Sequence, residues 1–134
     1  WIVGTMNPNY GGTYSLNEDF KSRWGFIPVG YMNEDKERKL LMDVFSTPAA
    51  AAEKNMVDIL LQLASASRTG KLGDYALSTR DLVHFVQDYE TVGKNKAFKI
   101  MEGKWDEDDV KHYRAQVMSL TRIDLKQFKL IDHD

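Results

Sequence analysis

Residues 78–93 read STRDLVHFVQDYETVG, and this stretch has the pattern of an amphipathic helix with a defined start and end. Ser78 is followed three residues later by Asp81, which resembles a capping box with Asp in place of the usual Glu. The apolar residues that follow recur at helical spacing and are Leu82, Phe85, Val86 and Tyr89. Gly93 is a typical residue for ending such a helix. The stretch therefore predicts a helix that buries one face.

The same apolar spacing predicts further helices on both sides of this stretch. One helix is expected from Asn33 until Pro48 interrupts the pattern, and a second from Pro48 to Gly70 or Gly73. A short helix should cover residues 96–101.

The last long helix is expected to begin at Asp106, which would act as its cap. Trp105 precedes that residue and Val110 follows it four positions later, which is typical of a hydrophobic staple around a helix start. Together these patterns predict that residues 33–134 form a small bundle of helices.

Residues 1–32 differ from the rest, because they hold five of the nine glycines and two of the three prolines. β-rich stretches at 1–5 and 26–32 bracket a Gly-rich loop and a short helical piece at 15–23. This order predicts the edge of an α/β sheet. We therefore expect a mainly α fold with a small β part, in which 33–134 form a helical domain. The chain opens inside an expected strand and without Met, so we expect it to be a piece of a longer protein.

The composition argues against several classes of function. Lys and Arg number 18 against 20 Asp and Glu, which gives a net charge of −2 and disfavours a nucleic-acid partner. Cysteine is absent and the three histidines are scattered, so neither a thiolate nor a histidine-based metal site is expected. No apolar run approaches the roughly 18 residues of a membrane helix. We expect a cytoplasmic protein with no membrane partner.

Three polar residues stand where chemistry could occur. Asn7 follows the first expected strand, where an amide could hold a water or a phosphate oxygen, although an Asn-Pro turn also explains it. Arg23 ends the expected short helix and could stabilise phosphoryl transfer in a partner, or simply interact with the helix dipole. Arg80 lies in a first helical turn, where its guanidinium could bind an anion or remain an exposed charge.

The sequence contains no complete nucleotide cradle. Gly70 and Lys71 faintly resemble a phosphate-binding loop, but Leu72 stands where Ser or Thr must bind Mg²⁺. The acidic run at 106–109 lacks the loop glycine and the later glutamate of an EF-hand.

The order of these segments resembles a stretch of AAA+ ATPases. Thr5-Met6-Asn7-Pro8, then Gly12-Thr13, then LNEDFKSRW at 16–24 are similar to the MoxR-type and dynein-related clade. The segment STRDL at 78–82 resembles the start of a lid helix in that clade.

The resemblance implies a fold and a set of roles. Residues 1–32 would be the C-terminal edge of the AAA+ α/β core, with its last strands, and 33–134 the α-helical lid. Asn7 would be sensor 1, which orients the attacking water. Arg23 would be the arginine finger, which reaches ATP on a neighbouring subunit, and Arg80 would be sensor 2.

The resemblance also implies cofactors and partners. ATP and Mg²⁺ would be held mainly by a P-loop and an acidic motif upstream of sensor 1, so this chain alone would be inactive. The parent protein would form a ring of identical copies, a hexamer in this family, and remodel or activate a client protein. The alternative from a different class is a non-enzymatic helical module that binds a partner protein.

Overall fold

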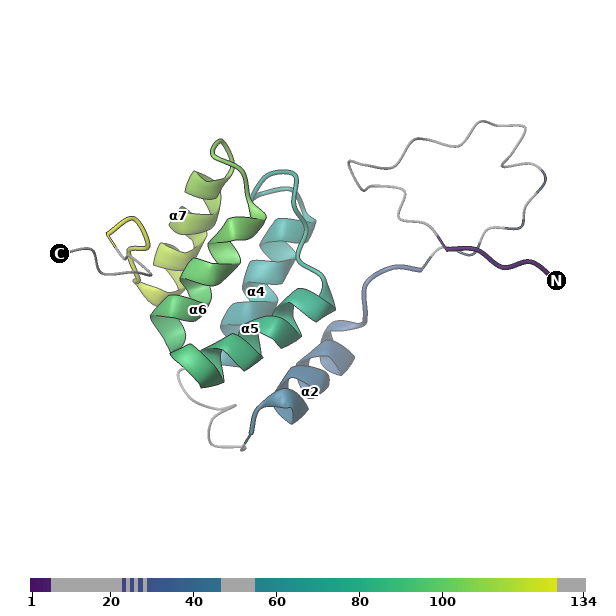
Figure 1. Cartoon of the computed structure of the whole chain (residues 1–134), viewed down its shortest axis with the longest axis horizontal. Helices are drawn as coiled ribbons and strands as arrows, with labels where there is room; N and C mark the ends of the chain where they lie inside the picture. The colour runs from purple at the N-terminus through teal and green to yellow at the C-terminus, as the bar shows by residue number, and fades with distance from the viewer. Residues whose placement is uncertain (6–22, 24, 26, 28, 47–54, 128–134) are drawn as a thin grey trace. The chain divides into compact units, whose positions relative to one another are not determined.

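The structure is a computed structural model that describes residues 1–5, 23, 25, 27, 29–46 and 55–127. The chain divides into two units, Trp1–Gly30 and Tyr31–Asp134. All helices of the described residues belong to the second unit, the helical unit (Figure 1). They are α2 (Glu34–Val44), α4 (Met56–Arg68), α5 (Thr79–Val92), α6 (Lys94–Met101), the 3₁₀ helix η2 (Glu102–Lys104) and α7 (Val110–Thr121).

The helix ends follow local chemistry. Asn33 caps α2, because its side chain accepts a hydrogen bond from the Asp35 N–H at 2.8 Å. Ser78 and Asp81 form the expected capping box at the start of α5. Gly93 ends α5 with a φ of 92°, in the region that glycine adopts without strain, and α6 begins at the next residue. The predicted helix at 78–93 is thus confirmed with both of its boundary signals.

One apolar core holds the helical unit together. α5 packs against α2 and α6, while α4 packs against α2 and α7. Each α-helix contributes buried side chains at helical spacing. The largest fully buried apolar side chains are Tyr113, Phe85, Phe98, Leu41, Met56, Leu60, Leu63, Leu72, Leu77, Leu82 and Leu125.

The expected α/β edge is wrong for the described residues, which are all helical or irregular and contain no strand. Residues 1–5 and the described part of 26–32 have no ladder, so neither the small β part nor the last strands of an AAA+ α/β core are present there. Trp1, Ile2 and Val3 have relative exposures of 119, 82 and 88%. A strand needs a partner ladder and a face to bury, and β-propensity alone supplies neither.

The start of the last helix also differs from the prediction. Asp106 caps a turn instead, with its carboxylate accepting from the Asp108 and Asp109 N–H groups at 3.1 and 2.9 Å. Helix α7 begins only at Val110, with Asp109 as its N-cap. The acidic run satisfies its backbone locally, which delays the helix by one turn.

The predicted short helix at 15–23 lies outside the described residues except for Arg23, which is in a turn. The predicted start of the second helix at Pro48 also lies outside them, but the described part of that helix is α4, which begins only at Met56 after Asn55 in the left-handed region (φ 54°). In the described part of the chain, no helix is both long and apolar enough to cross a membrane.

Candidate functional site

Arg80 is the second residue of α5 and its side chain is exposed. It makes no hydrogen bond or ion pair with any residue that the structure describes. The helix start beside it is already occupied, because the Ser78 side chain accepts from the Asp81 N–H at 3.2 Å and Asp81 accepts from the Ser78 N–H at 2.9 Å. The positive charge offered at this helix end is therefore the guanidinium itself.

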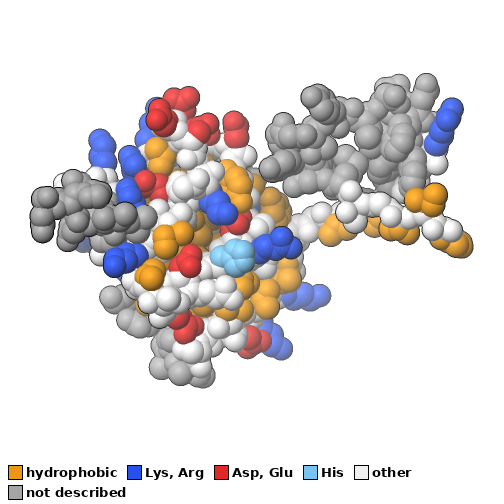
Figure 2. Space-filling view, viewed as in Figure 1, with side chains coloured by type: hydrophobic (Ala, Val, Ile, Leu, Met, Phe, Trp, Pro, Cys, Tyr) orange, Lys and Arg blue, Asp and Glu red, His pale blue; other side chains and the backbone are white. Residues whose placement is uncertain are grey.

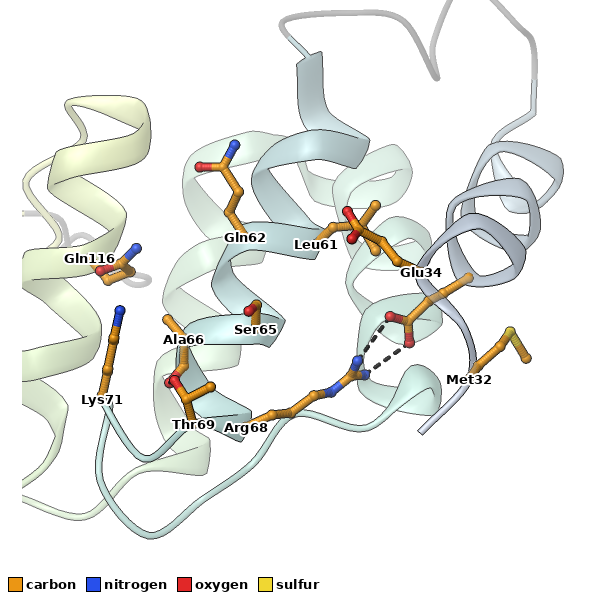
Figure 3. A pocket seen from close by; sticks show the side chains of 11 residues that line it. Met32, Glu34, Leu61, Gln62, Ser65, Ala66, Arg68, Thr69, Lys71 and Gln116 are labelled. Carbon is orange, nitrogen blue, oxygen red and sulfur yellow. Dashed lines mark hydrogen bonds and ion pairs between the residues drawn. The ribbon is translucent and has the colours of Figure 1, made fainter. Parts of the chain in front are cut away.

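A buried ion pair lies next to this helix start. Arg68, the last residue of α4, donates two hydrogen bonds of 2.9 Å to the carboxylate of Glu37 on α2. The side chains are 14 and 2% exposed. Figure 3 shows Arg68 reaching from α4 toward α2, with both contacts drawn. A bidentate Arg–carboxylate pair has a fixed geometry, so it orients the two helices as well as joining them.

The same pair extends to the first residue of α5. The Thr79 hydroxyl donates to Glu37 at 2.6 Å, which supplies a third donor for that carboxylate. Arg68 Nε donates to the Leu77 carbonyl at 2.8 Å. The Leu77 N–H donates to the Ser67 hydroxyl at 2.9 Å. We call Glu37, Arg68, Ser67 and Thr79 the Glu37 network; it joins α2, the end of α4 and the start of α5.

The charges in the Glu37 network are well satisfied. Burial raises the pKa of the Glu37 carboxyl, but hydrogen bonds from Arg68 and Thr79, together with the positive charge of Arg68, lower that pKa below its usual value. The Tyr31 ring centroid lies 4.1 Å from the Arg68 guanidinium carbon, a cation–π contact. Because the pair is ionised and Glu37 accepts from three donors, the pair is suited to positioning groups rather than to taking up protons.

Asp81 is held on the other side of the α5 start. The Tyr75 hydroxyl donates to its carboxylate at 2.8 Å, and Lys104 Nζ lies 3.4 Å from it. Burial raises the pKa of this carboxyl, but its hydrogen bonds with Ser78 and Tyr75 and the Lys104 charge lower the pKa overall. The positive charge of Lys104 offsets the negative charge of Asp81. Asp81 therefore competes less with an anionic ligand for the neighbouring Arg80 guanidinium.

An open pocket of about 480 Å³ adjoins the Glu37 network (Figure 3). Its walls come from α2, α4, the turn after α4 and α7, and they are mixed in charge, with Glu34 and Lys71 the exposed ions. Within the described ranges, no group of three or more His, Cys, Asp or Glu residues could hold a metal ion. On the face in Figure 2, Lys and Arg side chains are interspersed with Asp and Glu over the helical unit.

The other predicted site residues are placed as follows. Arg23 is an exposed turn residue of the first unit. Asn7 lies outside the described residues. Their expected roles as arginine finger and sensor 1 stay predictions.

Glu37 and Arg68 were missed by the sequence reasoning, although a signal was present. Glu37 precedes Leu41 by four residues and so lies on the apolar stripe of its helix. Arg68 follows Ala64 by four residues and lies on the apolar stripe of α4. Two opposite charges on two buried stripes indicate a buried ion pair, since an unpaired charge there would be too costly.

Comparison with known proteins adds no relative to this picture. No protein-family model matches the chain, and neither do the curated proteins or the solved structures.

Proposed function

We propose that this chain is the C-terminal part of an AAA+ ATPase of the MoxR-type clade and that its helical unit is the lid. The observation that carries the proposal is Arg80, an exposed and uncommitted guanidinium at the start of a helix that the Glu37 network holds in place. That is what a lid needs to contact a nucleotide bound elsewhere, and it coincides with the STRDL segment that resembles the family.

The roles of the chain's own residues follow from their chemistry. Arg80 contacts the phosphates of ATP and couples the lid to the nucleotide. Arg23 reaches the nucleotide of a neighbouring copy in the ring, where it stabilises the charge that develops in phosphoryl transfer. Asn7 orients the attacking water.

ATP and Mg²⁺ are held mainly by other parts of the parent protein in this proposal. The sequence has no P-loop, and the described residues contain no cluster of three or more His, Cys, Asp or Glu side chains that could hold a metal ion. The purified chain alone therefore has no ATP turnover above buffer. The complete protein acts in the cytoplasm as a ring of identical copies, a hexamer by family resemblance, on a client protein.

The test replaces the two arginines separately in the complete gene product. Arg80→Ala weakens nucleotide affinity, because a direct charge contact to phosphate is lost. Arg23→Ala retains nucleotide binding but loses turnover by about 10³–10⁵-fold, the range for an arginine finger supplied in trans. Nucleotide titration and steady-state ATP turnover measure the two effects.

Lys111→Ala is the matched control for Arg80→Ala, because Lys111 is an exposed cation at the second position of α7. It should leave both measurements unchanged. Near-normal turnover for Arg23→Ala, or an equal effect of Arg80→Ala and Lys111→Ala, would contradict the ATPase proposal.

A helical protein-interaction module is the second candidate, favoured by the all-helical character of the described residues. The complete reading frame separates the two candidates. A P-loop upstream of Trp1 supports the ATPase, and its absence supports the module. A binding assay between this chain and the upstream nucleotide-binding half gives the same distinction at the bench.

A further inference from the structure

Resting on the proposed function, we propose that Glu37 is a positioning residue for Arg80: through Thr79 and Arg68 it fixes the start of α5 and so the direction in which the Arg80 side chain leaves the helix. Glu37 does not touch the nucleotide. It acts on the residue immediately before Arg80.

The contacts of the Glu37 network converge on the segment that leads into Arg80. Thr79 is bound by its hydroxyl, and Leu77 is bound through both its carbonyl and its N–H. Thr79 is adjacent to Arg80 and Leu77 is three residues before it. These contacts from α2 and α4 hold the backbone that leads into α5. They add to the capping box, in which residues of α5 itself hold the helix start.

Stability alone is a weak account of this arrangement. A buried ion pair often adds little over apolar side chains of similar volume, because both charges lose their hydration. What the pair adds is geometric specificity, since its two-point contact and the third hydrogen bond from Thr79 fix how three helix ends meet. A long, exposed guanidinium is useful for recognising phosphate only if its helix start is held in a constant position.

The helical unit offers an internal comparison for a test. Glu102 accepts two hydrogen bonds of 2.9 Å from Arg114 and one of 3.0 Å from Lys99. Like Glu37 it is a carboxylate with a bidentate arginine and a third donor, but it is only partly buried and its donors come from α6 and α7. Substitution of Glu102 therefore removes a comparable ion pair without removing a hydrogen bond to the residues before Arg80.

The experiment measures nucleotide affinity and thermal unfolding of the complete protein for five variants: Thr79→Val, Thr79→Ser, Glu37→Gln, Glu102→Gln and Arg80→Ala. Thr79→Val is close to isosteric and removes only the link to Glu37. We expect it to weaken nucleotide affinity by about twofold to tenfold, the range for one hydrogen bond. Thr79→Ser retains the hydroxyl and restores affinity.

Glu37→Gln should weaken affinity at least as much as Thr79→Val, whereas Glu102→Gln should lower the unfolding temperature and leave affinity unchanged. If Glu37→Gln does not fold, the comparison of Thr79→Val with Thr79→Ser still tests the positioning role. Normal affinity in Thr79→Val while Arg80→Ala is impaired would overturn the positioning role and leave the ATPase proposal standing. Normal affinity in Arg80→Ala would overturn both.

Discussion

Glu37 and Glu102 are both ionised carboxylates inside the helical unit, yet they connect different kinds of neighbour. Glu37 is 2% exposed and takes its donors from residues 31 and 42 positions away in the sequence. Glu102 is 12% exposed and takes its donors from residues 3 and 12 positions away. The first carboxylate joins separate parts of the chain, while the second braces a local corner. The same residue chemistry thus serves long-range geometry in one place and local packing in the other.

The largest expected effect comes from removing each arginine. Arg68→Ala leaves Glu37 buried with only the Thr79 hydroxyl, and we expect a loss of about 3–5 kcal/mol in the free energy of unfolding. Arg114→Ala leaves Glu102 with Lys99 and more solvent, so we expect about 1–3 kcal/mol. Urea unfolding of the chain measures both. If Arg114→Ala loses as much unfolding free energy as Arg68→Ala or more, the claim that Glu37 depends more on its arginine than Glu102 does would be wrong.

A second test uses pH. Burial raises the pKa of both carboxyls, but their hydrogen bonds and cationic partners lower each pKa below its usual 4.5. A lowered pKa in the folded state gives stability that is present above the unfolded pKa and lost as pH falls through the folded value. Stability should therefore decline as pH falls below about 4.5 and toward the lowered pKa values of the folded state.

Glu37→Gln and Glu102→Gln separate the two contributions to this decline. Each variant should start less stable at neutral pH and lose less on acidification than the parent chain. The measurement is the unfolding free energy at several pH values. If the unfolding free energy of both variants depends on pH as it does in the parent chain, the decline comes from other carboxyl groups.

The smallest expected effect is local. Thr79→Val should speed amide hydrogen exchange at the start of α5, with a loss of about 0.5–1.5 kcal/mol in local opening free energy. Lys99→Met removes one donor from Glu102 and should leave exchange at the start of α5 unchanged. Exchange followed residue by residue by NMR distinguishes the two. Equal changes at α5 would mean that the two networks act as one.

The sequence predicts the helices of the unit from their apolar spacing, and it predicts α5 with both ends because this helix carries its own boundary signals. The capping box at Ser78 and the stop at Gly93 are local, and both are present. The strand expected at 1–5 depended on a partner ladder that a local pattern cannot supply, and it was wrong. Asp106 had the composition of a cap but used its carboxylate in a turn.

The candidate site was predictable only in part. Arg80 was singled out by its place in a first helical turn and by resemblance, and the structure places it exposed at the start of α5. Glu37 and Arg68 stand out only when a charge on an apolar stripe is read as a sign of a distant partner. Which partner each charge meets depends on how α2 and α4 pack, and no local spacing encodes that.

Tyr31 connects the Glu37 network to the start of the helical unit. It is the first residue of the helical unit, and its ring lies on the same guanidinium that binds the Leu77 carbonyl. An exposed cation–π contact is worth only about 0.5–1 kcal/mol, far less than the loss expected when one partner of the Glu37–Arg68 pair is removed. Loss of the Tyr31 ring should therefore cost little stability, because the Arg68 and Thr79 hydrogen bonds to Glu37 still join α2, α4 and α5.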